Sequence, residues 1–179
     1  MATSSITDLW DAIGDGAAGE SPLWEAALRP REEQEREPVF SDLARDEYRL
    51  GLETIYEGYL LHYGQSRLFA PADSDTALLL GDYLYAHGLV RIADRHVVQA
   101  VADLAELISI CAQVRAEGRS DDGPAWAASA ACLGAGVLDE ARAVFREEAN
   151  SVPLLALAHE TAGEAAVDEA LQAHLARVG

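Results

Sequence analysis

Apolar residues recur every three to four positions along most of the chain, which is the spacing that lines one face of a helix. The first long repeat runs from Phe40 to Gly64, and Ser41 is a suitable N-cap for its start. Further helices are predicted at residues 76–92, 97–117, 125–136, 138–150, 154–159 and 165–177. Because no alternating strand pattern competes with them, the sequence predicts an all-α helical bundle.

The first forty residues follow a different pattern. Gly14, Gly16 and Gly19 interrupt a short helical repeat, and residues 29–38 read RPREEQEREP, with many charges and no apolar face. Such a segment buries too little surface to offset the entropy lost on ordering. We therefore expect residues 1–40 to be a mobile acidic arm, cut first by proteases, and residues 41–179 to be one helical domain.

Composition excludes several classes of function. The chain has 31 acidic and 13 basic residues, a net charge of −18, and no lysine. This charge repels phosphate backbones and anionic membrane surfaces, so nucleic acid is not an expected partner. Mechanisms that require a lysine, such as Schiff-base chemistry, are excluded as well.

The two cysteines and the chain start bear on location. Cys111 and Cys132 lie in apolar helical patterns and are predicted to be reduced core thiols, with a disulfide or a metal role as the alternative. The first residues do not resemble a secretory signal, and the apolar runs are shorter than a membrane span. We expect a cytoplasmic protein without a membrane-spanning segment.

The run TALLLGDYLYAHG contains a glycine and an aspartate, Gly81 and Asp82, in an otherwise apolar helix. A helical glycine costs about 1 kcal/mol relative to alanine, so this pair needs a compensating reason. The segment GDYLYAHG, a later helix ending in CAQVRAEG, and the small-residue helix AASAACLGAG follow one another in order. Together, over about residues 50–160, they resemble the trans-isoprenyl diphosphate synthases, the polyprenyl synthetase family.

This resemblance implies a bundle similar to part of the isoprenoid synthase fold. It implies that Gly81 lets a neighbouring helix approach closely and that Asp82 meets a polar network or solvent. It also implies that the helices at 76–92 and 97–117 form a subunit interface.

The family's catalytic motifs are missing. Its members bind magnesium through two aspartate-rich motifs of the DDxxD type, whereas this chain has Glu57 in the first region and Glu160 and Glu164 in the second. Of the basic residues that hold diphosphate, Arg67 remains in the first region and the expected lysine is absent. We therefore expect a pseudoenzyme with no catalytic residues, no cofactor and no metal.

Other metal and catalytic patterns are weaker. Asp8, Asp11 and Asp15 have helical spacing and offer the sharpest metal hypothesis, with a solvated acidic face as the alternative. The histidines do not follow the Glu-x-x-His pattern of di-iron bundles.

Two functions are compatible with these features, and a third, a residual enzyme, would need an unrecognised metal site. The first is a non-catalytic subunit or interaction scaffold that forms a homodimer, or a heteromer with a catalytic prenyl synthase. On this hypothesis arginine at Leu89 or Leu104 would split the dimer. The second is a binding module that holds a prenyl chain or another apolar ligand in a helical cavity. Its walls would be tyrosines at helical spacing, which otherwise belong to the core: Tyr56, Tyr59, Tyr63, Tyr83 and Tyr85.

Overall fold

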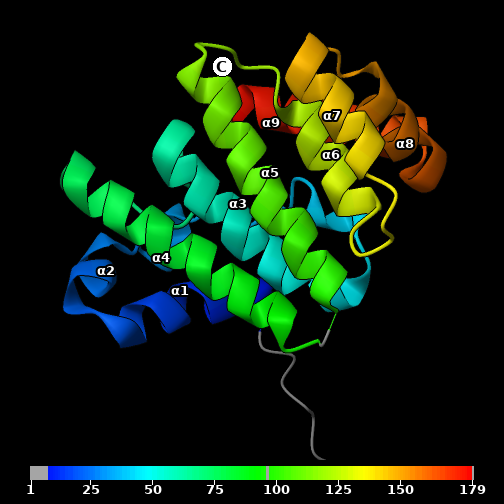
Figure 1. The fold of residues 1–179 in the computed structure, drawn as a ribbon. Coiled ribbons are helices and arrows are strands. Elements are labelled where there is room, and N and C mark those ends of the chain that lie inside the picture. Colours follow the sequence, from blue (N-terminus) through cyan, green and yellow to red (C-terminus); the bar gives the residue numbers. More distant parts are fainter. Residues whose placement is uncertain (1–7, 96, 179) are drawn as a thin grey trace, which may run out of the picture.

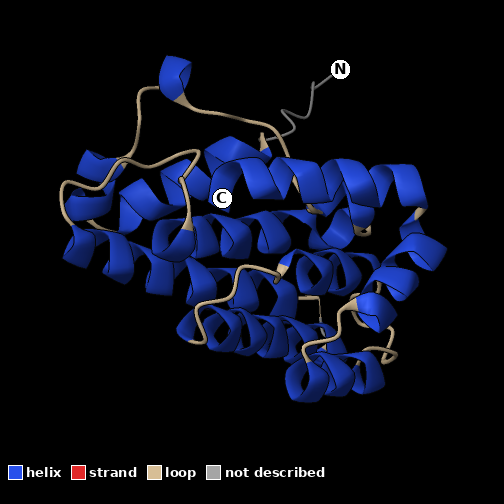
Figure 2. Ribbon diagram, turned by 90° about the horizontal axis from the view of Figure 1, so that it is seen from above, coloured by secondary structure: helices blue, strands red, loops and turns tan. Residues whose placement is uncertain are grey.

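The computed structural model describes residues 8–95 and 97–178. Within these ranges the chain forms nine α-helices, three short 3-10 helices and no strand (Figure 2). The prediction of an all-α bundle is confirmed. The α-helices are α1 (Leu9–Glu20), α2 (Pro22–Ala27), α3 (Arg49–Tyr63), α4 (Ser74–Ala93), α5 (Val98–Ala116), α6 (Gly123–Ala131), α7 (Asp139–Glu148), α8 (Val152–Ala162) and α9 (Glu164–Val178). The 3-10 helices are η1 (Arg31–Glu33), η2 (Ser41–Leu43) and η3 (Asp46–Tyr48).

The central contact of the bundle is an antiparallel pair, α3 and α4, whose backbones meet at two glycine crossings. A Cβ on Gly58 would lie 2.8 Å from the carbonyl oxygen of Gly81, and a Cβ on Gly88 would lie 2.9 Å from that of Gly51. Real Cβ atoms do not come this close to backbone. Since the glycines in each helix are seven residues apart, which is about two turns, both lie on the contacting face. Gly81 therefore permits close helix packing.

The main hydrophobic core lies between α3 and the helices α5 to α9. Trp126 on α6 is fully buried near its centre, with Tyr56 at 4.9 Å and Tyr59 at 5.2 Å between ring centroids. The small residues around Trp126 on α6 let neighbouring helices approach closely. α4 and α5 diverge from the turn that joins them and lie at the front in Figure 1.

Residues 8–40, the described part of the expected mobile arm, are packed against the bundle, contrary to that expectation. Trp10, Ile13 and Ala17 on α1 are buried in a second core with Leu80 and Leu84 of α4. Figure 1 shows α1 and α2 beside α4, on the side away from α5. The short apolar repeat before residue 20 is therefore sufficient to dock α1, despite its glycines.

The charged segment after α2 is neutralised by partners that are distant in sequence. Arg36 lies 3.1 Å from Asp8 and 2.7 Å from Asp11, and Arg31 also pairs with Asp11. These hydrogen bonds hold the pKa of Asp11 below its ordinary value. Asp8 and Asp11, two of the three predicted metal candidates, thus bind arginines, and Asp15 is exposed.

The predicted helix at residues 40–64 begins late. Residues 41–48 form η2 and η3, and α3 starts at Arg49. The backbone N–H groups of Val39 and Ser41 donate to the carboxylate of Glu53 at 3.3 Å each, and this draws the chain away from a helical path. Ser41 is therefore not an N-cap of α3. Similarly, α4 is capped by Asp73, which accepts from the N–H of Thr76 at 2.7 Å.

Candidate functional site

The region where the resemblance places the first metal motif contains a buried ion-pair network. The guanidinium of Arg67 lies 2.8 Å from Glu53 and 3.0 Å from Glu57, which are one turn apart on α3. Burial alone would lower the pKa of Arg67, but the two carboxylates outweigh it and raise the pKa above its ordinary value. The ring of Trp10 lies 4.7 Å from the guanidinium carbon and closes the network on one side.

The same two carboxylates hold loops against α3. Glu53 accepts from the backbone of residues 39 and 41, while Glu57 accepts from the hydroxyl of Ser66 and from the N–H of Leu68 at 2.9 Å. Arg67 also donates to the carbonyl oxygen of Glu37 at 2.9 Å. Because these groups are buried and engaged, Glu57 and Arg67 have a structural role in this arrangement.

A second buried network surrounds Asp122, just before α6. Asp122 accepts from the hydroxyl of Tyr59 at 2.6 Å and from Arg115 at 3.1 Å, and it lies 3.5 Å from His174 on α9. The hydroxyl of Tyr56 lies 2.9 Å from the other ring nitrogen of His174. Burial raises the pKa of Asp122, but its hydrogen bonds with His174 and Tyr59 and the charge of Arg115 outweigh it, so the pKa is lowered. This network ties α3, α5 and α9 to the start of α6.

The five candidate tyrosines do not share one cavity. Tyr56 and Tyr59 belong to the filled core around Trp126, where burial is the main cause of their raised pKa values. Tyr63 lines a shallow pocket beside Arg115. The remaining two lie elsewhere on α4: Tyr85 stacks on His62 at 5.1 Å and Tyr83 packs against Trp24 at 4.2 Å.

Gly81 and Asp82 have separate roles at the α3–α4 contact. A Cβ on Gly81 would lie 2.6 Å from Nε2 of His62, so the glycine makes room for that ring. The same nitrogen lies 3.2 Å from the carboxylate of Asp82, whose side chain is 72% exposed while that of His62 is 11% exposed. Asp82 thus reaches the outer surface of α4 with a histidine beneath it.

The outer surfaces of α4 and α5 form a largely apolar surface that no other described element covers. Its most exposed members are Leu79 at 61%, Val90 at 56% and Val98 at 82%. Near the joining turn it contains an open groove of about 470 Å³ lined only by alanine and valine side chains. We call this surface the α4–α5 face. Its residues are Leu78, Leu79, Asp82, Ala86, Val90, Ala93, Val97, Val98, Val101, Ala102, Ala105 and Ala112.

Leu104 does not belong to this face. It is fully buried in the core beneath α5, and Leu89 is partly buried. Arginine at Leu104 would therefore disrupt the core of the monomer, and the expectation that it probes an interface is wrong. Sequence periodicity identified α5 as apolar on several sides but could not separate the inner side from the outer one.

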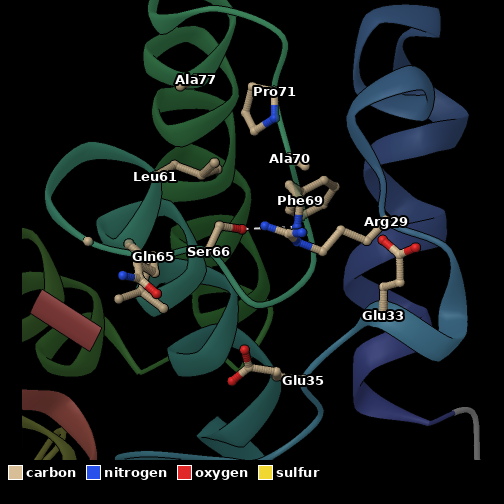
Figure 3. Close-up of a pocket in the computed structure, with 12 residues that line it drawn as sticks. Arg29, Glu33, Glu35, Leu61, Gln65, Ser66, Phe69, Ala70, Pro71 and Ala77 are labelled. Carbon is tan, nitrogen blue, oxygen red and sulfur yellow. Dashed lines mark hydrogen bonds between the residues drawn. The ribbon is translucent and has the colours of Figure 1, made fainter. Parts of the chain in front are cut away.

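A pocket of about 510 Å³ lies between the segment after α2, the C-terminal end of α3 and the start of α4. Figure 3 shows the Arg29 side chain extending across it toward Ser66 and Phe69, away from the carboxylate of Glu33. We call it the Arg29 pocket. Its lining residues are Arg29, Glu33, Glu35, Leu60, Leu61, Gly64, Gln65, Ser66, Phe69, Ala70, Pro71 and Ala77. No sequence motif pointed to it, because its residues come from three separate segments.

Comparison with models of protein families, with curated proteins and with solved structures finds no match to this chain. The similarity to isoprenyl diphosphate synthases therefore stays a prediction. Among the described residues, no three His, Cys, Asp or Glu side chains are grouped so that they could hold a metal ion. None of the described helices is long and apolar enough to cross a membrane.

Proposed function

We propose that this protein is a non-catalytic interaction scaffold that forms a homodimer through the α4–α5 face. The observation that carries the proposal is the uncovered apolar surface itself, with Val98 at 82% and Leu79 at 61% exposure. Contiguous exposed apolar surface of this kind is typical of protein interfaces. A bundle related to isoprenyl diphosphate synthases would use the same two helices for its subunit contact.

Charge distribution supports association at this face. Each copy has a net charge of −18, so two copies repel each other over most of their surfaces. Within the α4–α5 face the acidic side chain is Asp82, which lies against His62, and the exposed Asp75 and Asp94 lie at the two ends of α4. In a twofold dimer the same face would meet itself, so apolar surface would be covered on both copies at once.

The positions of the residues in the two motif regions support the pseudoenzyme part of the proposal. Glu57 and Arg67, which stand in the first motif region, are held in a buried structural network with Glu53. Glu160 and Glu164, in the second region, are exposed near the contact of α8 and α9. A cytoplasmic location is part of the same proposal, since Cys111 and Cys132 are both free and buried.

Two exposed valines test the interface as a matched pair. Val98 and Val152 are each the first residue of a helix, α5 and α8, but only Val98 lies on the α4–α5 face. Val98→Arg would bury an unpaired charge twice in a dimer, which costs several kcal/mol and weakens association by more than about 100-fold. Val152→Arg, at a residue that is 68% exposed, should associate like the parent. Light scattering after gel filtration distinguishes these outcomes, and equal masses for both variants would contradict the proposed interface.

A second candidate function rests on the groove of about 470 Å³ near the joining turn. Because alanine and valine alone line it, a prenyl chain or another apolar ligand could lie there. Binding of a fluorescent prenyl analogue to the parent, reduced by Val101→Asp, would favour this function. If the parent is monomeric and binds no such ligand, a heteromer with a prenyl synthase is the remaining form of the scaffold proposal.

A further inference from the structure

Arg29 differs from most arginines of this acid-rich chain. Most of the others form ion pairs, including the exposed Arg31 and Arg45 and the partly buried Arg119. Among the described residues, the guanidinium of Arg29 forms no ion pair and donates no hydrogen bond, although the chain has 31 acidic residues. An unpaired guanidinium that extends across a pocket of about 510 Å³ is available to bind an anionic group.

The backbone around Arg29 is held on both sides. Its N–H donates to the carbonyl oxygen of Leu68 at 2.9 Å, and its own carbonyl oxygen accepts from the Gln34 side chain at 2.7 Å. Leu28 and Phe69 form an antiparallel bridge next to it. These bonds position the base of the Arg29 side chain before any ligand arrives, which reduces the entropy cost of binding.

Negative charge lies at a different place in the same pocket. Glu33 lines the pocket, and Figure 3 shows its carboxylate beside the base of the Arg29 side chain, whereas the guanidinium lies at the far end of that side chain. Glu35, the other acidic lining residue, is already paired with Arg177 at 2.9 Å. The C-terminal end of α3 also contributes to the wall, through Leu61 and Gly64, and the end of a helix favours positive charge. The pocket therefore has one positive and one negative binding group, at separate positions.

Apolar side chains supply the rest of the wall. Leu61, Phe69, Pro71 and Ala77 lie together on the α3 and α4 side of the pocket. The volume of about 510 Å³ is within the usual range for small-molecule sites, roughly 300–1,000 Å³. A ligand for this pocket needs an anionic group, a cationic group and an apolar body.

We propose that the Arg29 pocket binds a zwitterionic α-amino acid with an apolar side chain. Its carboxylate would bind Arg29, its ammonium group would lie near Glu33 and the end of α3, and its side chain would contact Phe69 and Leu61. A ligand without net charge is favoured because the net charge of −18 repels simple anions. This site is independent of the proposed α4–α5 interface.

L-phenylalanine is the probe, since its ring gives clear signals in saturation-transfer NMR and its heat of binding can be titrated. The comparison ligands are 3-phenylpropionate, which lacks the ammonium group, and 2-phenylethylamine, which lacks the carboxylate. We expect the parent to bind L-phenylalanine at least 10-fold more tightly than either. Equal binding of 3-phenylpropionate would overturn the assignment of a zwitterion, and no binding of L-phenylalanine at millimolar concentration would overturn the site.

Substitutions locate the two charged contacts. Arg29→Gln and Glu33→Gln should each weaken L-phenylalanine binding at least 10-fold. Arg45→Gln removes an arginine outside the pocket whose side chain is 69% exposed, and it should bind like the parent. Circular dichroism shows whether each variant is folded. Unchanged binding by folded Arg29→Gln would contradict the proposal, and a monomeric parent would not affect it.

Discussion

Replacing Gly58 by alanine tests whether the glycine crossings set the distance between α3 and α4. The new Cβ would lie 2.8 Å from the carbonyl oxygen of Gly81, 3.1 Å from the Tyr85 ring and 3.2 Å from the Cβ of Leu84. The carbonyl oxygen of Gly81 belongs to the backbone of α4, and the Cβ of Leu84 is bonded directly to that backbone. Neither atom can rotate away from the new methyl group. The helices must therefore separate by a few tenths of an ångström, and the Gly51–Gly88 crossing loosens with them.

Two opposing effects determine the size of the change. Alanine improves helix propensity by about 1 kcal/mol over glycine. Overpacking costs about 1–3 kcal/mol, and we place this site at the upper end because a rigid backbone atom is the neighbour. The net destabilisation should be about 1–2 kcal/mol, which for a chain of this size lowers Tm by about 2–8 °C.

Gly19→Ala is the matched control. Gly19 is also helical, but no atom lies within 4 Å of its added Cβ. Because the added methyl group meets no other atom, only the gain in helix propensity affects stability. This variant should therefore be more stable than the parent by about 0.5–1 kcal/mol. Thermal and urea unfolding followed by circular dichroism measure both changes. A Gly58→Ala variant as stable as Gly19→Ala would refute the close approach of α3 and α4.

Three further substitutions test other parts of the structure. Asp122→Asn leaves Arg115 without its buried carboxylate partner. It should lower the free energy of unfolding, measured with urea, by about 3 kcal/mol. Since the pKa of Asp122 is lowered in the folded state, the parent should lose this contribution as pH falls below about 4, and the variant should show less acid dependence. Trp10→Ala should lower the free energy of unfolding by about 3–4 kcal/mol and make α1 accessible to limited proteolysis. A variant as stable as the parent would mean that the fold does not need the docking of α1. Asp82→Asn should tighten self-association, because it removes a carboxylate that would face its own copy across a twofold interface; sedimentation of the parent and the variant at the same pH checks this.

Helical periodicity predicted the long helices well because it is a local property of the chain. The helices at 76–92 and 97–117 correspond closely to α4 and α5. For residues 8–40 the expectation of mobility differs from the structure because Arg31 and Arg36 pair with Asp8 and Asp11, more than fifteen residues away. Composition alone cannot show such pairings.

The buried networks and the Arg29 pocket had no local signal. Glu53 and Arg67 occupy ordinary positions in the sequence, and only the fold brings them to 2.8 Å. One signal was available: glycines seven residues apart in both α3 and α4, which mark the close helix contact. The spacing of Gly81 and Gly88 alone could not identify Gly51 and Gly58 as their partners.

Sedimentation velocity of the unmodified protein tests the central proposal most directly. At micromolar concentrations we expect a single species with twice the chain mass of 19.2 kDa and no larger assemblies. On further dilution this dimer should dissociate to the monomer. A closed dimer of this kind follows from a face that meets its own copy. A species of 19.2 kDa at every concentration would contradict self-association through the α4–α5 face.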